Sequence, residues 1–227
     1  MAKAEKKNNV LVKANKHGKH PIKFLSFLRI FILPLYRLVR PFKVYGRYEP
    51  NAGAYIFVSN HYTMTDPGYI LGATKDGVRF MAKKEIEKKP VFGAVAKWVK
   101  CIFVNRDGND VRALLDCLKV LKNGEKLVIY AEGTRNKTDE DILPFKHGAS
   151  ALAIKTKTPV IPLVIYSKPK FFKRAHILMG QPIEFSEYYD KKLMEEDFAI
   201  VDEKIRTIMI EMKREHKAYL QSKNTKK

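Results

Sequence analysis

The sequence is poor in cysteine and in acidic residues, and both shortages narrow the classes of protein to which it can belong. Its two cysteines, Cys101 and Cys117, stand neither in a CxxC pair nor in a His/Cys cluster. A structural metal is therefore not expected, and a reducing compartment fits. Aspartate and glutamate number 24 against 44 lysines and arginines, which leaves a net charge of +20. This excess predicts an anionic partner, such as a nucleic acid, an acidic membrane surface or a phosphorylated substrate.

The chain also lacks an apolar run that is both long and uninterrupted. Its most apolar stretch, residues 24–39, would measure about 24 Å as a helix, short of the ~30 Å hydrocarbon core of a bilayer. Arg29 and Pro34 interrupt it. A full membrane span is therefore disfavoured. No small-residue cleavage site follows the stretch, so a cleaved signal peptide is not expected either.

What the chain does contain is enough apolar sequence for one folded domain. Hydrophobic residues fill 45% of the 227 positions, which suits a single α/β domain with a sizeable core. Strand-like runs are 43–47, 54–58, 78–82, 101–104, 126–131, 160–165 and 176–179, and helix-like runs are 67–74, 91–100, 110–121, 149–157 and 191–221. Their alternation predicts an α/β fold in which helices flank a mostly parallel mixed sheet.

The apolar stretch at 24–39 has two faces when it is wound as a helix. Apolar side chains cover most of its surface and leave one narrow polar face. That face holds Lys23, Ser26, Arg29, Tyr36, Arg37 and Arg40. Such a helix is typical of the membrane interface, with arginines reaching toward anionic headgroups, although a helix packed against the domain stays open. Pro34 is expected to bend the helix or to divide it in two.

These patterns divide the chain into four parts. Residues 1–22 are predicted to form a basic mobile tail, and 23–41 an amphipathic membrane-docking helix or helix pair. Residues 42–221 form the main domain, whose last element is the long charged helix, and 222–227 form a frayed tail.

A histidine and an aspartate stand where a predicted strand gives way to a predicted helix. His61 follows the strand at 54–58, and Asp66-Pro67 resembles a helix start, with Asp66 at the N-cap and Pro67 at the first helical position. Open α/β sheets bind their ligands at such edges. If the intervening loop turns, Asp66 can hold one imidazole nitrogen and leave the other as a general base. Alone, the H-x4-D pattern favours a loop histidine beside a helix cap.

Two further predicted strands run into polar turns that carry an arginine. The strand at 126–131 leads into Glu-Gly-Thr-Arg at 132–135, and the strand at 101–104 leads to Arg106. Glycine permits close backbone approach, threonine offers a hydroxyl, and a planar guanidinium suits phosphate. We therefore expect the two arginines to join the histidine and aspartate in one site at the edge of the sheet.

Four ordered blocks of sequence support a family resemblance. They are Asn60-His61-x4-Asp66, Ile102-Phe103-Val104-x-Arg106, Glu132-Gly133-Thr134-Arg135 and Val160-Ile161-Pro162. In order and spacing, over about residues 45–165, they resemble the blocks of the glycerolipid acyltransferase family. The nearest likeness is to the bacterial 1-acyl-sn-glycerol-3-phosphate acyltransferases. With this resemblance, a catalytic pair of His61 and Asp66 becomes the preferred interpretation over a loop histidine beside a helix cap.

The resemblance implies the chemical roles at the centre of the site. His61 would be the general base that removes the proton of the acceptor hydroxyl, and Asp66 would orient and support its imidazolium. Glu132 would contact the glycerol part of the substrate or hold the arginines. Because a thiolate leaves readily, no serine or cysteine nucleophile is needed, and the chain has no G-x-S-x-G.

The resemblance also implies a binding site for the phosphate of the acceptor. Arg106 and Arg135 would clamp it, in a pocket shaped by Gly133 and Thr134. Lys83 matches a basic position that often serves the phosphate, and the lysine after it is an equal candidate by sequence. No metal and no cofactor is implied.

As a whole, the resemblance predicts an O-acyltransferase of phospholipid biosynthesis. The donor would be a fatty acyl thioester of acyl-carrier protein or coenzyme A, and the acceptor lysophosphatidic acid, which becomes phosphatidic acid. The enzyme would lie on the cytoplasmic face of the cell membrane as a peripheral or monotopic protein and bind anionic lipid.

Other functions compete with this one. The same fold could acylate glycerol-3-phosphate, another lysophospholipid or an amino-acid-derived lipid, and the same residues could activate water in a hydrolase. A nucleic-acid-binding protein would explain the charge, but it would need aromatics interleaved with Lys/Arg on a recognisable module. Here most aromatics lie in apolar strands or in 24–39, so nucleic acid is not expected as a partner.

Overall fold

The structure, a computed structural model, describes residues 23–46, 53–74, 77–105, 110–146 and 148–225. The predicted basic tail at 1–22 lies outside the described residues, and so does Arg106.

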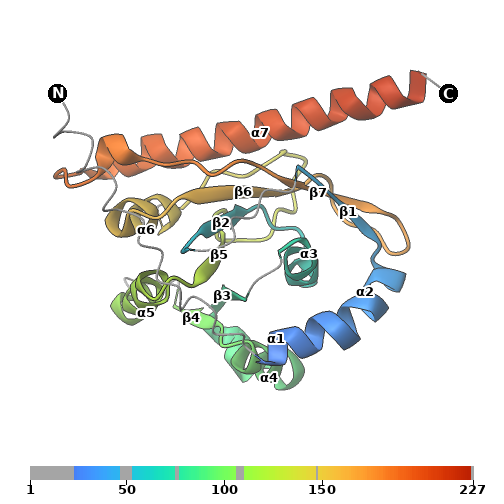
Figure 1. Cartoon of the computed structure of the whole chain (residues 1–227), viewed down its shortest axis with the longest axis horizontal. Helices are drawn as coiled ribbons and strands as arrows, with labels where there is room; N and C mark the ends of the chain where they lie inside the picture. Colours follow the sequence, from blue (N-terminus) through green and yellow to red (C-terminus); the bar gives the residue numbers. More distant parts are fainter. Residues whose placement is uncertain (1–22, 47–52, 75–76, 106–109, 147, 226–227) are drawn as a thin grey trace, which may run out of the picture.

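Seven strands of the described residues form one sheet, in the order β1-β7-β6-β2-β5-β3-β4 (Figure 1). They are β1 (Phe42–Tyr45), β2 (Ile56–Ser59), β3 (Val78–Lys83), β4 (Ile102–Val104), β5 (Lys126–Tyr130), β6 (Val160–Ile165) and β7 (Ala175–Met179). Neighbouring strands run parallel except β6 and β7, which are antiparallel. The prediction of a mostly parallel mixed sheet is confirmed.

The central strands are buried on both faces because helices cover both sides of the sheet (Figure 1). The helices of the main domain are α3 (Asp66–Ala73), α4 (Pro90–Trp98), α5 (Val111–Lys122), α6 (Gly148–Thr156) and α7 (Glu195–Thr225). Along β2, Ile56 and Val58 pack in a core with α5, α6 and α7, while Phe57 packs in a second core with α3. Each such side chain contributes roughly 1.5–3 kcal/mol when fully buried.

The two ends of α7 differ from the prediction. The helix begins at Glu195 rather than at residue 191. Its first turn contains three acidic residues, which suit the positive end of the helix dipole. It continues through Thr225, so most of the predicted frayed tail at 222–227 is helical. Side-chain hydroxyls of Ser222 and Thr225 donate to carbonyl oxygens one turn back, which satisfies groups that a frayed end would leave to water.

The apolar N-terminal stretch is helical from Lys23 to Val39. It consists of α1 (Lys23–Phe27), a π-helical turn (Leu28–Ile32) and α2 (Leu33–Val39), drawn in Figure 1 as one ribbon below the sheet. The N–H of Leu33 donates to the carbonyl of Leu28, an i→i+5 bond that widens the helix just before Pro34. The predicted division at Pro34 therefore takes the form of a π turn. Among the described residues, none of the helices has the length and apolarity needed to cross a bilayer.

The arginines of this N-terminal helix do not point where the sequence predicted. Arg29 donates from Nε to the carbonyl of Leu71 and from Nη2 to Oγ1 of Thr74, each at 3.2 Å, at the C-terminal end of α3. Arg40 is 7% exposed and donates to the carbonyl of Pro169. The expectation that arginines reach out to headgroups is therefore wrong for these two, because carbonyl oxygens of the domain bind them. The large side chains that the helix exposes are mostly apolar; Arg37 is exposed as well, and its guanidinium donates to the carbonyl of Phe42 at 3.4 Å.

Candidate active site

The His61–Asp66 pair spans the junction between β2 and α3: His61 lies in the loop after the carboxyl end of β2, and Asp66 is the first residue of α3. His61 Nδ1 is 2.8 Å from Oδ2 of Asp66, so the loop makes the turn that the spacing required. Asp66 is completely buried and also accepts from the N–H of Tyr62 at 2.6 Å, and from the N–H and hydroxyl of Thr63 at 2.8 and 2.6 Å. Four donors around one carboxylate offset the cost of burying its charge.

The predicted helix cap at Asp66 is wrong by one residue. Thr65 is the N-cap of α3, and Asp66 is the first helical residue, with Pro67 next. The carboxylate turns back toward the loop that precedes it, because the loop N–H groups and the imidazole are its donors. Asp66 therefore organises the histidine loop rather than the helix end.

The backbone and ring of His61 are held as firmly as its Nδ1. Its N–H donates to Oε2 of Glu132 at 3.1 Å, and its carbonyl accepts from the N–H of Asn136 at 2.6 Å. The ring stacks on Tyr130, with 4.1 Å between centroids and 22° between planes. Since Asp66 accepts the proton on Nδ1, the neutral ring keeps its lone pair on Nε2. This geometry suits a general base.

Glu132 is a buried carboxylate behind the histidine. It is 2% exposed, and its Oε1 accepts from the N–H of Leu143 at 3.0 Å while Oε2 accepts from His61. Burial raises the pKa of Glu132 to about 7, against the opposing effect of the two backbone N–H groups. The contacts expected for Glu132 are substrate glycerol or the arginines; the contacts present tie the histidine to the loop after β5.

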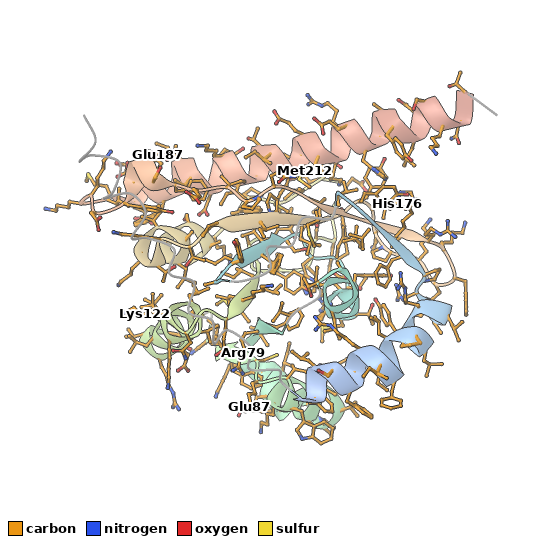
Figure 2. All side chains as sticks on the ribbon, in the orientation of Figure 1. Arg79, Glu87, Lys122, His176, Glu187 and Met212 are labelled. Atoms are coloured by element: carbon orange, nitrogen blue, oxygen red, sulfur yellow. The ribbon has the colours of Figure 1, made fainter. Side chains whose placement is uncertain are left out.

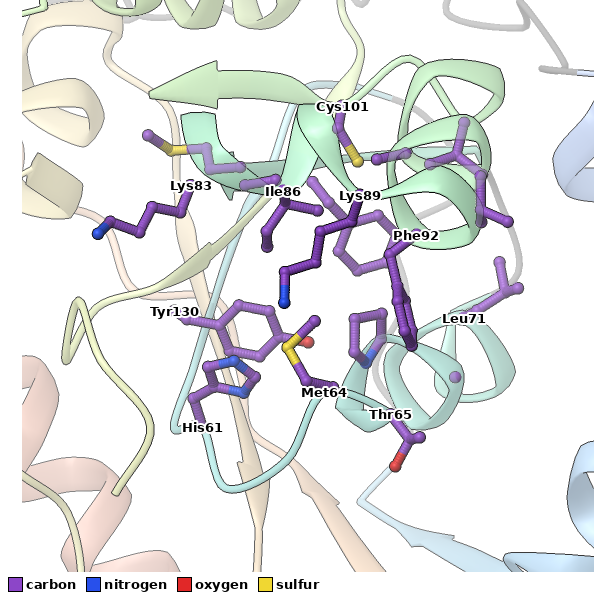
Figure 3. A pocket seen from close by; sticks show the side chains of 18 of the residues that line it. His61, Met64, Thr65, Leu71, Lys83, Ile86, Lys89, Phe92, Cys101 and Tyr130 are labelled. Carbon is purple, nitrogen blue, oxygen red and sulfur yellow. The ribbon is translucent and has the colours of Figure 1, made fainter. Parts of the chain in front are cut away.

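A cavity of about 660 Å³ opens beside the pair (Figure 3). Its polar end is lined by His61, Thr134, Arg135 and Lys83, and Glu85, the partner of Lys83, lines it as well. Apolar side chains line most of the rest; they come from the N-terminal helix, α3, β3, the 3-10 helix Lys84–Lys88, α4 and the residue after α4, and include Leu28, Leu33, Leu71, Phe80, Ile86, Phe92 and Val99. A mostly apolar cavity with arginine and lysine side chains beside the histidine suits a ligand that joins a phosphate to an acyl chain.

Three of the predicted phosphate residues, Lys83, Thr134 and Arg135, line this cavity, and Gly133 lies in the turn directly before Thr134. Thr134 and Arg135 are exposed. Gly133 has φ of +65°, a left-handed conformation that favours glycine, and a β-carbon there would lie 2.8 Å from the Lys146 side chain. The strand pairing of β2 with β5 explains the convergence, because it sets Ser59 opposite Tyr130 and so brings the two loops together.

Lys83 and Lys84, which were equal candidates for the phosphate by sequence, differ in their position relative to the cavity. Lys83 lines the cavity and pairs with Glu85 at 2.8 Å. Lys84 pairs with Glu87 at 2.6 Å and is not among the cavity residues. Lys89, which the sequence did not single out, also lines the cavity, and its ammonium points into it (Figure 3). Its only sequence signal is a cation directly before the proline that starts α4.

Metal ligands do not gather in the part of the chain that the structure describes: it holds no group of three or more His, Cys, Asp or Glu side chains arranged to bind an ion.

Comparison with known proteins places the chain in a family. The family model described as Acyltransferase matches residues 41–166, which is more than half of the chain. This protein therefore belongs to the acyltransferase family, as the four sequence blocks predicted.

Named relatives make the comparison more specific. The chain is 32% identical over 124 residues to a 1-acyl-sn-glycerol-3-phosphate acyltransferase of Helicobacter pylori, covering 54% of this chain and 52% of that protein. It is 30% identical over 161 residues to the enzyme of the same name from Streptococcus pneumoniae, covering 67% and 58%. The chain thus spans about half the length of the curated relatives it matches.

A solved structure shares the fold. The crystal structure of the 1-acyl-sn-glycerophosphate acyltransferase from Thermotoga maritima matches with a TM-score of 0.68 and 24% identity, over 94% of this chain and 87% of that one. The α/β architecture extends beyond the family-matched segment to nearly the whole chain.

Proposed function

We propose that this chain transfers a fatty acyl group from a thioester to the 2-hydroxyl of 1-acyl-sn-glycerol-3-phosphate, giving phosphatidic acid. The observation that carries the proposal is a His–Asp pair beside a mostly apolar cavity whose polar lining includes Arg135 and Lys83. Relatives named as 1-acyl-sn-glycerol-3-phosphate acyltransferases support the choice of acceptor.

In the proposed reaction, Nε2 of His61 takes the proton of the acceptor hydroxyl while the oxygen attacks the thioester carbonyl. Asp66 stabilises the imidazolium that forms, since its carboxylate already holds Nδ1 at 2.8 Å. Collapse of the tetrahedral intermediate releases the thiolate, which receives the proton back from the imidazolium. No step needs a covalent bond to the protein.

The cationic end of the cavity is proposed to bind the acceptor phosphate. Arg135 and Thr134 supply a guanidinium and a hydroxyl, Gly133 sets the turn that presents them, and Lys83 adds a charge. Arg106 joins this group by family resemblance. Glu132 acts as a positioning residue, because its carboxylate holds the backbone of His61.

The N-terminal helix is proposed to rest on the cytoplasmic face of the membrane, which makes the enzyme peripheral or monotopic. Its exposed side chains are mostly apolar, with Arg37 among them; the apolar ones include Phe27, Ile30, Phe31, Leu35 and Leu38. Other side chains of the same helix line the cavity, among them Leu25, Leu28 and Leu33. A lipid could thus pass from the bilayer into the cavity along one helix, while the net charge of +20 favours anionic lipid and an acidic acyl carrier.

A turnover assay on purified protein tests the proposal. Anionic vesicles carry lysophosphatidic acid, and the donor is acyl-carrier protein or coenzyme A thioester in separate reactions. We expect phosphatidic acid to form, with glycerol-3-phosphate and lysophosphatidylcholine as poor acceptors. A faster rate with either of these acceptors would reassign the acceptor, and thioester hydrolysis without ester formation would replace the transferase with a hydrolase.

A further inference from the structure

The turn between β6 and β7 carries an exposed aromatic pair that the proposed chemistry does not use. Phe171 and Phe172 stand at the tip of this hairpin, 61% and 75% exposed, between two strands that are almost entirely buried. Adjacent aromatic side chains held in water are unfavourable in a monomer and mark a surface that another phase or molecule covers.

The tip is fastened to the protein in a conformation that keeps these rings outside. Phe172 has φ of +59°, a left-handed conformation that residues with a β-carbon rarely adopt. Its N–H donates to the carbonyl of Val39 at 2.8 Å, and the guanidinium of Arg40 lies 3.8 Å from the centre of the Phe171 ring. Arg40 also donates to the carbonyl of Pro169. An unfavourable backbone conformation maintained by specific bonds is typical of functional segments.

Cations surround the aromatic pair. Residues 167–174 read Ser-Lys-Pro-Lys-Phe-Phe-Lys-Arg and contain no acidic residue. Lys168, Lys170, Lys173 and Arg174 are all exposed. Aromatic rings flanked by cations match the boundary of an anionic bilayer, where rings enter the headgroup layer and cations meet phosphates.

The tip continues the apolar surface of the N-terminal helix. Val39, whose carbonyl receives the Phe172 N–H, follows Leu38, which is 72% exposed. Figure 1 shows the hairpin loop beside the end of α2, and Figure 2 shows the side chains of both segments in the same orientation. One amphipathic helix leaves a protein free to roll about the helix axis, whereas a second contact beside it fixes the roll.

We propose that the β6–β7 tip is a second membrane contact, in which Phe171 and Phe172 insert into an anionic bilayer and the four flanking cations bind lipid phosphates. This inference rests on the proposed docking of the N-terminal helix. The tip sets the orientation of the protein so that the cavity faces the lipid.

Vesicle partitioning tests the inference separately from catalysis. The probe is the full chain with vesicles of phosphatidylglycerol and phosphatidylcholine, compared with phosphatidylcholine alone. Phe171→Ser/Phe172→Ser should weaken partitioning into anionic vesicles at least tenfold. The matched control is Val111→Ser/Leu115→Ser on α5, which removes two side chains of 61% and 58% exposure far from the tip and should change partitioning little (Figure 1).

Phe172→Gly distinguishes a membrane contact from a purely structural role of Phe172, because the two roles predict different combinations of Tm and vesicle partitioning. Glycine tolerates the left-handed conformation, so this variant should keep or raise the Tm while it weakens vesicle partitioning. Partitioning equal to that of the wild type in both tip variants, or a wild type that does not bind anionic vesicles, would overturn the inference. If the wild type binds vesicles through the tip but transfers no acyl group, the proposed function fails and the membrane contact stands.

With acyl transfer established, a kinetic comparison separates the two roles further. The tip variants should lose turnover on lysophosphatidic acid held in vesicles but keep the wild-type rate on the same lipid dispersed in detergent. An equal loss in both assays would contradict a membrane contact and place the tip in the catalytic machinery.

Discussion

The two ends of the cavity are built from different interactions. At the polar end, hydrogen bonds fix His61 through its ring, its N–H and its carbonyl, and the carboxylates that hold it are buried. At the end that we propose faces lipid, Leu28 and Leu33 of the N-terminal helix line the cavity, while Phe31 and Leu35 of the same helix are exposed on its outer surface. Directional bonds preorganise the histidine that we propose as the general base, whereas non-directional apolar contact suits lipid chains of varied shape.

The contrast gives each end its own sensitivity to substitution. Changes at the polar end should alter chemistry and leave membrane binding intact, and changes at the lipid-facing end should do the reverse. The substitutions below, ordered from the largest expected effect to the smallest, test this separation and, for Glu132, the protonation of the polar end.

Asp66→Asn should lower kcat about 1000-fold or more. An amide cannot accept from all four donors that the carboxylate serves, so the imidazole loses the partner that keeps the proton on Nδ1. Single-turnover kinetics on vesicle-borne acceptor measure the loss, and vesicle partitioning should stay at the wild-type level. A variant within tenfold of the wild-type rate would contradict the assigned role.

Glu132→Gln should change how stability depends on pH. The pKa of Glu132 is raised from 4.5 to about 7 in the folded protein, so the folded state holds this proton more tightly than the unfolded chain. The resulting stabilisation is full below about pH 4.5 and is lost as pH rises through about 7, amounting to up to about 3 kcal/mol.

Denaturant unfolding of wild type and variant at about pH 5 and about pH 8 measures this difference. The wild type should lose more stability over the interval than Glu132→Gln does. Glu140→Gln, an exposed carboxylate on the same loop, should follow the wild type. Equal pH dependence in all three proteins would show that Glu132 does not titrate as proposed.

Arg135→Ala should raise the acceptor KM about 10- to 100-fold, the loss expected for one charge-assisted contact with phosphate. The donor KM should change little, because the negative charge of the donor lies on its carrier and not at the site proposed for the acceptor phosphate. Arg112→Ala on α5, which removes the same charge from an exposed site, is the control. Equal increases in the two KM values would argue against a phosphate site at Arg135.

Leu35→Ser/Leu38→Ser should weaken partitioning into anionic vesicles about tenfold, because the two side chains are 61% and 72% exposed on the outward surface of the N-terminal helix. Turnover on detergent-dispersed acceptor should stay close to the wild-type rate. A loss of that turnover with unchanged partitioning would mean that the helix supports the site and not the membrane contact.

The polar end could be predicted from sequence more fully than the lipid-facing end. The strand runs before His61 and Glu132 fixed where the two loops emerge, and parallel pairing of β2 with β5 then brings them together. The contact between Glu132 and the N–H of His61 was not predictable, since it joins residues 71 apart and depends on the conformation of both loops.

The N-terminal helix shows why the rest could not be read from sequence. A helical wheel gives the angle between side chains but not the side of the helix that meets the protein. The arginines could face anionic headgroups or backbone carbonyls, and the carbonyls of Leu71 and Pro169 bind Arg29 and Arg40. Exposed apolar pairs such as Phe171-Phe172 likewise look like core residues until the fold places them at a hairpin tip.

The most direct test of the account is the single-turnover rate of His61→Ala on vesicle-borne lysophosphatidic acid, measured at vesicle concentrations that bind all of the protein. The account predicts a rate at least 1000-fold below that of the wild type, with unchanged Tm and unchanged vesicle partitioning. A rate within tenfold of the wild type, from protein that is folded and membrane-bound, would contradict the assignment of His61 as the base.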